Sequence, residues 1–220
     1  MVGHTYLSNP GILKLKSLID SGKLGDILYG IALRLGLSPI RKSASVLWDL
    51  ASHDVSIALY LFGIPTSLSC IGESYIQRGI EDYANIVLRY QNKINFSIYT
   101  SWFCPEKIRK VTLVGKNKMA VFDDMNKSEM IKVFKKKLNS TLLNNSPTYI
   151  DHQNIVKEGT IEIPYIDQSE PLKNQINHFI ECVRTRRTPR SDGEHGLKVI
   201  KILETAEKSL KNNGKMIKIR

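Results

Sequence analysis

The sequence predicts an α+β fold in which helices pack on one face of a large, mostly antiparallel open sheet. Three observations indicate this class. Strand patterns dominate residues 67–123, and their connections QNK and KNK are short enough to be hairpin turns. Helical patterns gather at the two ends of the chain. No linker rich in Pro, Gly or Ser divides the 220 residues, so we expect a single domain, 1–220.

The first two elements follow from a change of period near the start of the chain. Asn9 and Pro10 are a typical cap and first-turn pair, and the apolar residues that follow have helical spacing until Gly22. After Gly25 the period becomes two, with Ile, Tyr, Ile, Leu and Leu at alternate positions of 27–35. This alternation predicts a strand.

The remaining elements are predicted in chain order. Five strands are expected in SLSCIGESYI, YANIVLRY, INFSIYTSWF, KVTLVG and MAVFDD, paired antiparallel. Residues 126–159, with the charge run FKKK and the polar stretch LNSTLLNNSPT, are expected to form a surface excursion of loop and hairpin. Two helices then close the chain, followed by the short strand MIKI. Their apolar residues are Ile176, Phe179, Ile180 and Val183, then Leu197, Ile200, Leu203, Ala206 and Leu210.

Composition narrows the class of protein. The net charge is +11, but Lys and Arg are spread along the whole chain, which favours a basic solvated surface, then an anionic small-molecule substrate, and only then nucleic acid. The three cysteines are far apart and form no CxxC pair, so we expect reduced thiols and no zinc site. No apolar run reaches the roughly 18 residues of a membrane span, and the start has no secretory signal. We therefore expect a cytoplasmic protein.

The stretch WDLASHDVSIALYLFG predicts a second helix that is mostly apolar yet carries Asp49, His53 and Asp54 near its start. Residues four apart share a helix face, so Asp49 and His53 are expected to project together. A carboxylate beside an imidazole can act as an acid/base pair. Two other interpretations stay open: an ordinary surface or capping pair at a helix start, and a metal site that includes Asp54.

The chain resembles the substrate-binding half of the glucose-fructose oxidoreductase, inositol dehydrogenase and rhizopine catabolism (Gfo/Idh/MocA) family. The resemblance rests on VGHTYLSNPGILKLKSLIDSGKLGDILY, VLWDLASHDVSIALYLFGIP, TSWFCPEKIRKVTLVGKNKMAVFDD and SEPLKNQINHFIECVRTRRTPRSDGEHGLKVIKILETAEKSL. In that family, Asp-x-x-x-His on this helix holds the catalytic acid and base. The resemblance therefore implies that Asp49 and His53 are catalytic, with His53 taking a hydroxyl proton while hydride leaves for NAD or NADP.

The pieces WDL, SW and KIRKVTLVGKNKMAVFDD resemble most closely the branch that oxidises UDP-N-acetylglucosamine derivatives at ring position 3. This implies a sugar or nucleotide-sugar substrate, and a diphosphate suits a basic protein. The candidate substrate contacts, each with core, cap or surface packing as the alternative, are Arg41, Lys107, Arg109, Tyr6, Trp102 and Asn9.

The family's nucleotide-binding half has no counterpart in this sequence. There is no GxGxxG after a strand, and no Glu-Lys-Pro segment with the lysine that completes the family's catalytic group. Residues 1–8 correspond to the last strand of that half. We therefore expect the isolated chain to be incomplete for catalysis, with a separate cofactor-binding chain as a possible partner and a homo-oligomer formed through the sheet. The alternative function is a non-catalytic binding or oligomerisation module.

Overall fold

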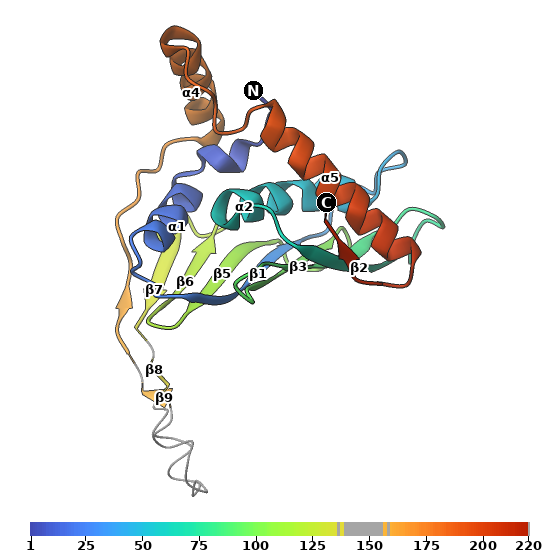
Figure 1. Cartoon of the computed structure of the whole chain (residues 1–220), viewed down its shortest axis with the longest axis horizontal. Helices are drawn as coiled ribbons and strands as arrows, with labels where there is room; N and C mark the ends of the chain where they lie inside the picture. Colours follow the sequence, from blue (N-terminus) through green and yellow to red (C-terminus); the bar gives the residue numbers. More distant parts are fainter. Residues whose placement is uncertain (136, 139–155, 158, 220) are drawn as a thin grey trace, which may run out of the picture.

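The computed structural model describes residues 1–135, 137–138, 156–157 and 159–219 of the chain. In this part, one nine-stranded sheet runs through the molecule, and the helices α1, α2 and α5 lie over one of its faces (Figure 1). All neighbouring strands are antiparallel except β1 and β4, which run parallel. The α+β class with a mostly antiparallel open sheet is confirmed.

The strands follow the predicted segments closely. In spatial order the sheet reads β10-β7-β6-β5-β1-β4-β3-β2-β11, so β1 lies at its centre. The hairpins at QNK and KNK join β3 to β4 and β5 to β6. The bounds are β1 Ile27–Leu35, β2 Ser67–Glu73, β3 Tyr83–Arg89, β4 Asn95–Ser101, β5 Ile108–Gly115, β6 Met119–Asp123, β7 Ile131–Phe134, β10 Ile161–Glu162 and β11 Ile217–Lys218. A separate two-stranded ladder pairs β8 (Lys137–Leu138) with β9 (Val156–Lys157).

Helix α1 begins at the predicted cap. The Asn9 side chain accepts a hydrogen bond from the backbone N–H of Gly11 at 2.8 Å, which satisfies a free donor at the start of α1. Asp192 caps α5 in the same way, at 2.7 Å from the N–H of His195. The bounds are η1 Thr5–Ser8 (3₁₀), α1 Pro10–Asp20, η2 Leu47–Ala51 (a π-helical turn), α2 Ser52–Phe62, α4 Pro171–Thr185 and α5 Gly193–Lys211.

The core lies between the sheet and the helices above it. In β1, the face that meets the helices consists of Gly30, Ala32 and Arg34, each buried, whereas the alternate residues from Tyr29 to Leu35 lie on the opposite face and stay partly or largely exposed. Ile27, separated from Tyr29 by a register shift, packs against the core. No helix of the described residues covers that opposite face (Figure 1). The bulkier set of side chains in this strand is therefore the one outside the core.

The prediction of a surface excursion over 126–159 is wrong at its start. Residues Ile131–Phe134 form β7, which pairs with β6 inside the main sheet, and Ile131 is fully buried while Val133 is 3% exposed. This strand is only four residues long and runs into the charge run FKKK, so its short apolar pattern was assigned to the polar segment that follows. The later part of the excursion, residues 136, 139–155 and 158, lies outside the described residues.

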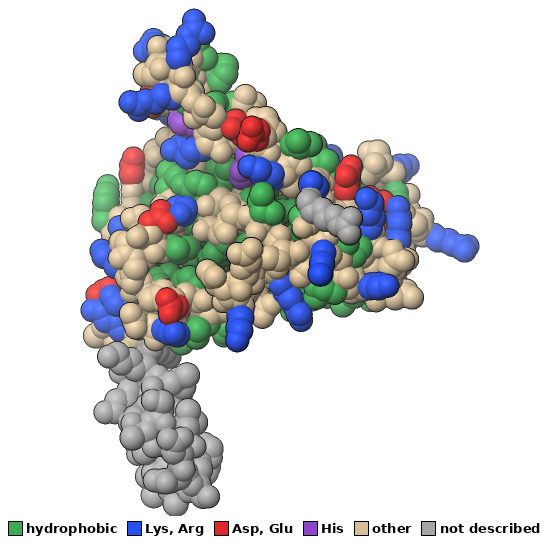
Figure 2. All heavy atoms as spheres, in the orientation of Figure 1, with side chains coloured by type: hydrophobic (Ala, Val, Ile, Leu, Met, Phe, Trp, Pro, Cys, Tyr) green, Lys and Arg blue, Asp and Glu red, His purple; other side chains and the backbone are tan. Residues whose placement is uncertain are grey.

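Helix α4 projects away from the rest of the molecule (Figure 1). The apolar residues predicted from helical spacing, Ile176, Phe179, Ile180 and Val183, stay exposed, as does Leu172 at the start of the helix; all five are between 42% and 59% accessible. Figure 2 shows apolar side chains along this projecting helix, and Lys and Arg scattered over the visible face rather than gathered in one tract.

Residues 1–8, compared above with a strand of another domain, contain the 3₁₀ turn η1 and no strand. None of the described helices is both long and apolar enough to cross a membrane.

Candidate active site

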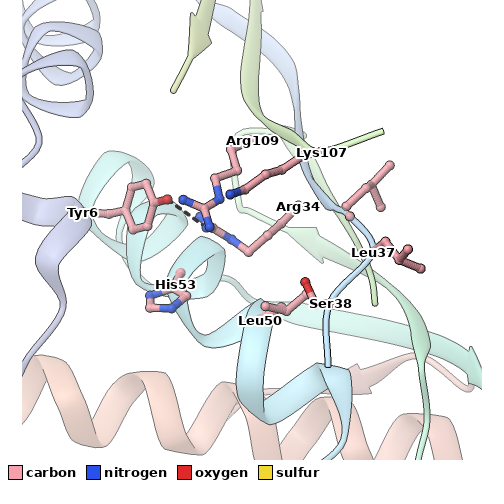
Figure 3. A pocket seen from close by; sticks show the side chains of 10 residues that line it. Tyr6, Arg34, Leu37, Ser38, Leu50, His53, Lys107 and Arg109 are labelled. Atoms are coloured by element: carbon pink, nitrogen blue, oxygen red, sulfur yellow. Dashed lines mark hydrogen bonds between the residues drawn. The ribbon is translucent and has the colours of Figure 1, made fainter. Parts of the chain in front are cut away.

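A cavity of about 300 Å³ opens where the end of β1 meets the start of α2. Its lining residues are Tyr6, Arg34, Leu35, Gly36, Leu37, Ser38, Leu50, His53, Lys107 and Arg109. Figure 3 shows Tyr6, Arg34 and His53 reaching this cavity from separate elements and lying together there with Lys107 and Arg109, which come from just before and at the start of β5. The fold thus brings His53 together with three predicted substrate contacts.

His53 lies in the first turn of α2, and its ring centroid is 5.5 Å from that of Tyr6. Burial lowers the pKa of His53, and the positive charges of Arg34 and Arg109 lower it further, against the opposing effect of two carboxylates on the same helical segment. The net direction is downward. At neutral pH the imidazole is therefore uncharged and able to accept a proton.

Asp49 lies in the π-helical turn η2, and other side chains occupy both of its carboxylate oxygens. Arg41 Nε donates to Oδ1 and the indole N–H of Trp102 donates to Oδ2, each at 3.0 Å. Trp102 is only 1% exposed. No hydrogen bond joins Asp49 to His53 in the described structure, and Asp49 is not among the residues that line the cavity. Arg41, Trp102 and Asp49 therefore form a group beside the cavity, outside its wall.

A buried ion pair that the sequence analysis missed lies beside the cavity. Arg34 on β1 donates two hydrogen bonds to Asp54 on α2, from Nε to Oδ2 at 2.6 Å and from Nη2 to Oδ1 at 3.1 Å. A third donor, Nη1, binds the hydroxyl of Tyr6 at 3.0 Å. The available signal was that Arg34 is the only charged residue in the strand pattern 27–35. Asp54 was considered only as a metal ligand, a role that its pairing with Arg34 does not favour.

A second cavity, of about 440 Å³, shares Tyr6 and Arg109 with the first. It is organised around the carboxylate of Asp124, which accepts from Tyr6 and Asn9 at 3.2 Å each and from Lys127 at 3.0 Å. Arg109 Nη1 lies 3.7 Å from the same carboxylate. Burial raises the pKa of Asp124, but its bonds with Lys127, Tyr6 and Asn9 prevail and lower it. Asn9 thus lines the second cavity as well as capping α1.

The described residues contain no group of three or more His, Cys, Asp or Glu side chains placed to hold a metal ion. They also do not fit a dinucleotide. Such sites use a strand, a Gly-rich turn and a helix within a βαβ unit. Among the described strands, only β1 and β4 run parallel, separated in the chain by α2, β2 and β3, and Gly193 opens α5 after a loop rather than a strand.

The fold is shared with solved oxidoreductases. UDP-N-acetylglucosamine 3-dehydrogenase from Acidithiobacillus ferrooxidans matches with a TM-score of 0.76 and 18% identity, over 96% of this chain and 61% of that one. Aldose-aldose oxidoreductase from Caulobacter crescentus, complexed with glycerol, matches with 0.77 and 15%, over 99% and 63%. Levoglucosan dehydrogenase in complex with NADH matches with 0.80 and 14%, over 100% and 66%.

These likenesses show the fold, and the chain spans 61% to 66% of the length of the three structures. A search of curated proteins found no match. The model of the GFO/IDH/MocA C-terminal domain matches residues 12–121, half of the chain. The matched segment runs from α1 to β6 and includes the ion pair, His53 and both strands that bring cations to the cavity. The chain therefore belongs to the Gfo/Idh/MocA oxidoreductase family, as a C-terminal domain of that family.

Proposed function

We propose that this chain is the substrate-binding half of a nicotinamide-dependent oxidoreductase that acts on a secondary alcohol of a sugar or nucleotide sugar. One observation carries the proposal: His53, held uncharged, lines a cavity whose other polar walls are Tyr6, Arg34, Lys107 and Arg109. An uncharged imidazole beside hydrogen-bond donors is suited to remove the proton of an alcohol. The family membership supports the reaction class.

In the proposed reaction, the alcohol carbon loses a proton from its hydroxyl and a hydride from its C–H bond and becomes a ketone. His53 accepts the proton. The hydride acceptor is NAD or NADP, which supplies the redox chemistry when a separate domain or chain holds it. Without that half the chain is inactive as a dehydrogenase, because nothing holds the hydride acceptor against the substrate carbon. Asp49 is proposed to act through its position beside the helix start rather than by bonding His53.

The charge balance of the two cavities supports an anionic substrate. Arg34, Lys107, Arg109 and Lys127 bring four positive charges to their walls, whereas the lining carboxylates, Asp124 and Glu170, both belong to the second cavity. Asp54 lies behind the first cavity, paired with Arg34. Lys107 and Arg109 remain at the mouth, where Lys107 is exposed and the Arg109 side chain is 39% exposed. Guanidinium and ammonium groups in such positions bind phosphate well.

The cofactor-holding partner is proposed to cover the exposed apolar stripe of α4. Pro171 and Leu172, at the start of α4, line the second cavity, so the stripe begins at the rim of the cavity system. A domain that presents nicotinamide to His53 has to rest against this rim. Between 61% and 66% of the length of these solved relatives is covered by this chain, so more than a third of each lies outside the match, which is room for such a domain. A homo-oligomer through the helix-free face of the sheet remains a second proposed contact.

Calorimetric titration of the purified chain tests the proposal. UDP-N-acetylglucosamine, its uronic acid, free N-acetylglucosamine and NAD are titrated separately. We expect the two UDP sugars to bind, the free sugar to bind more weakly and NAD not to bind. Replacing both cations at the mouth, Lys107→Met with Arg109→Met, should weaken UDP-sugar binding at least about tenfold, since charge-assisted contacts to phosphate are lost.

The matched control is Lys110→Met, on the same strand as Arg109 with a similarly exposed side chain but outside both cavities. It should leave the affinity unchanged. If neither UDP sugar binds, or if the double variant binds as well as the wild type, the proposed substrate site is wrong.

The second candidate function is a binding or oligomerisation module without chemistry. One observation favours it: Asp49, one of the two family catalytic positions, is held by Arg41 and Trp102 away from the cavity wall. A chain that self-associates through the sheet but binds no UDP sugar would support this alternative.

A further inference from the structure

The ion pair between Arg34 and Asp54 joins the centre of the sheet to the helix that carries His53. The two side chains are 7% and 2% exposed, and both hydrogen bonds between them have good geometry. Apolar residues of similar volume usually stabilise a fold as well as a buried ion pair does. The stability of the core therefore does not by itself require charges here, and their position beside His53 suggests a task at the cavity.

The remaining donor of Arg34 acts on Tyr6. Nη1 donates to the Tyr6 hydroxyl at 3.0 Å, and the guanidinium carbon lies 4.4 Å from the centroid of the Tyr6 ring. The hydroxyl in turn donates to Asp124 at 3.2 Å. Because Tyr6 is bonded on both sides, its ring has a fixed place in the cavity wall, and the ring of His53 packs against it at 5.5 Å.

The charged and titratable groups that act on His53 lie on several neighbouring elements. Arg34 on β1 and Arg109 on β5 are positive, and His4 before η1 is a titratable neighbour. Asp49 and Asp54 are negative, but Asp54 accepts hydrogen bonds from Arg34, and Asp49 accepts them from Arg41 and Trp102. In the part of the chain that the structure describes, no carboxylate hydrogen-bonds to the imidazole of His53. Asp49 and Asp54 therefore act on His53 through their charge alone, without a hydrogen bond to its ring.

We propose that Arg34, anchored by Asp54, is a positioning residue: it fixes Tyr6 in the cavity wall and holds a permanent positive charge beside His53. This inference rests on the proposed function for its purpose, because an uncharged imidazole is what proton removal from an alcohol needs. Its physical content, the control of the charge of His53 by Arg34, is independent of any substrate.

The test is an NMR pH titration of the histidine rings in the whole 220-residue chain, with the His53 signal identified by its loss in His53→Asn. In Arg34→Met the pKa of His53 should rise by about one unit, a tenfold gain in proton affinity. In Arg34→Lys, which keeps the charge, the pKa should stay close to the wild-type value. A purely structural role for Arg34 would not separate these two variants.

Arg34→Met leaves Asp54 buried without a partner and can fail to fold. The double variant Arg34→Met with Asp54→Leu removes both charges and provides the second measurement. Its His53 pKa should still rise, by less than in the single variant, because the larger influence of Arg34 and the smaller, opposite influence of Asp54 are both removed. Arg89→Met, an exposed arginine at the end of β3, is the matched control and should change nothing.

An unchanged or lower His53 pKa in the double variant, or in a folded Arg34→Met, overturns the inference. A rise in both, with Arg34→Lys near wild type, supports it. These titrations use neither sugar nor cofactor. Failure of UDP-sugar binding would therefore remove the proposed function and leave this result standing, whereas an insensitive His53 would remove only the role of Arg34.

Discussion

Removing the carboxylate of Asp54 should be among the most destabilising single changes in this fold. Asp54→Leu leaves the guanidinium of Arg34, which is 7% exposed, without its two charge-assisted hydrogen bonds at 2.6 and 3.1 Å. Breaking a buried ion pair by removing one partner costs about 3 to 5 kcal/mol, because the other charge stays desolvated. This is a large share of the roughly 5 to 15 kcal/mol that holds a domain folded.

For a domain of this size, each kcal/mol shifts the melting temperature by about 2 to 4 °C, so Asp54→Leu should melt about 6 to 20 °C below wild type. The assay is thermal and urea unfolding followed by circular dichroism. In the double variant Arg34→Met with Asp54→Leu, most of the lost stability should return, because no buried charge is left unpaired.

The matched control is the ion pair between Lys116 and Asp26, which has a comparable distance of 2.8 Å but lies in solvent, with 61% and 79% of the side chains exposed. Asp26→Asn should leave the unfolding midpoint unchanged, since exposed pairs are screened by water and salt. If Asp54→Leu melts with the wild type, or if the double variant is less stable than the single one, the reasoning about a buried, mutually dependent pair is refuted.

Three further predictions concern pH, thiols and packing. Burial lowers the pKa of His4 to about 4, and the other described histidines are also shifted downward, so the unfolded chain binds more protons than the folded one between about pH 4 and 6.5. Stability should be fully present above pH 6.5 and fall as the pH drops towards 4; urea midpoints that stay level from pH 7.5 to 5 would contradict this. Burial raises the pKa of the Cys70 thiol to about 12, so an aromatic disulfide reagent should modify half-buried Cys104 well before Cys70 in the native chain, and equal rates would be inconsistent with the fold. In Gly30→Ala the new Cβ would lie 2.5 Å from the ring of Phe96, so urea unfolding should show a loss of about 1 to 3 kcal/mol, whereas Gly193→Ala meets nothing within 4 Å and should be tolerated.

Local signals predicted most of the fold. The cap at Asn9, the period-two strands and the two short hairpins all depend on residues close together in the sequence, and each appears where it was expected. The prediction failed for β7, because this strand has only four residues and adjoins a run of lysines, so its alternation is too short to separate it from the polar segment that follows. It also gave no basis for choosing which face of β1 is buried, since that depends on which side the helices occupy.

Local patterns also predicted part of the site. His53 was found from a local helix pattern and a family resemblance, and it lies in the cavity with Tyr6 and Arg109. The partners of Asp49 and Asp54 come from residues 8 to 53 positions away, so no local pattern indicates that Trp102 holds one carboxylate and Arg34 the other. Whether Asp49 and His53 are catalytic stays a prediction.

The central claim is that the cavity containing His53 receives the sugar of a nucleotide sugar. The most direct measurement follows the His53 ring signal by NMR while UDP-N-acetylglucosamine is added to the whole chain, with His178, on α4 and distant from the cavity lining, as the internal reference. The account predicts that the His53 signal shifts and saturates while that of His178 does not move, and that the shift disappears in Lys107→Met with Arg109→Met. Binding that leaves His53 unmoved, or no binding at all, would contradict it.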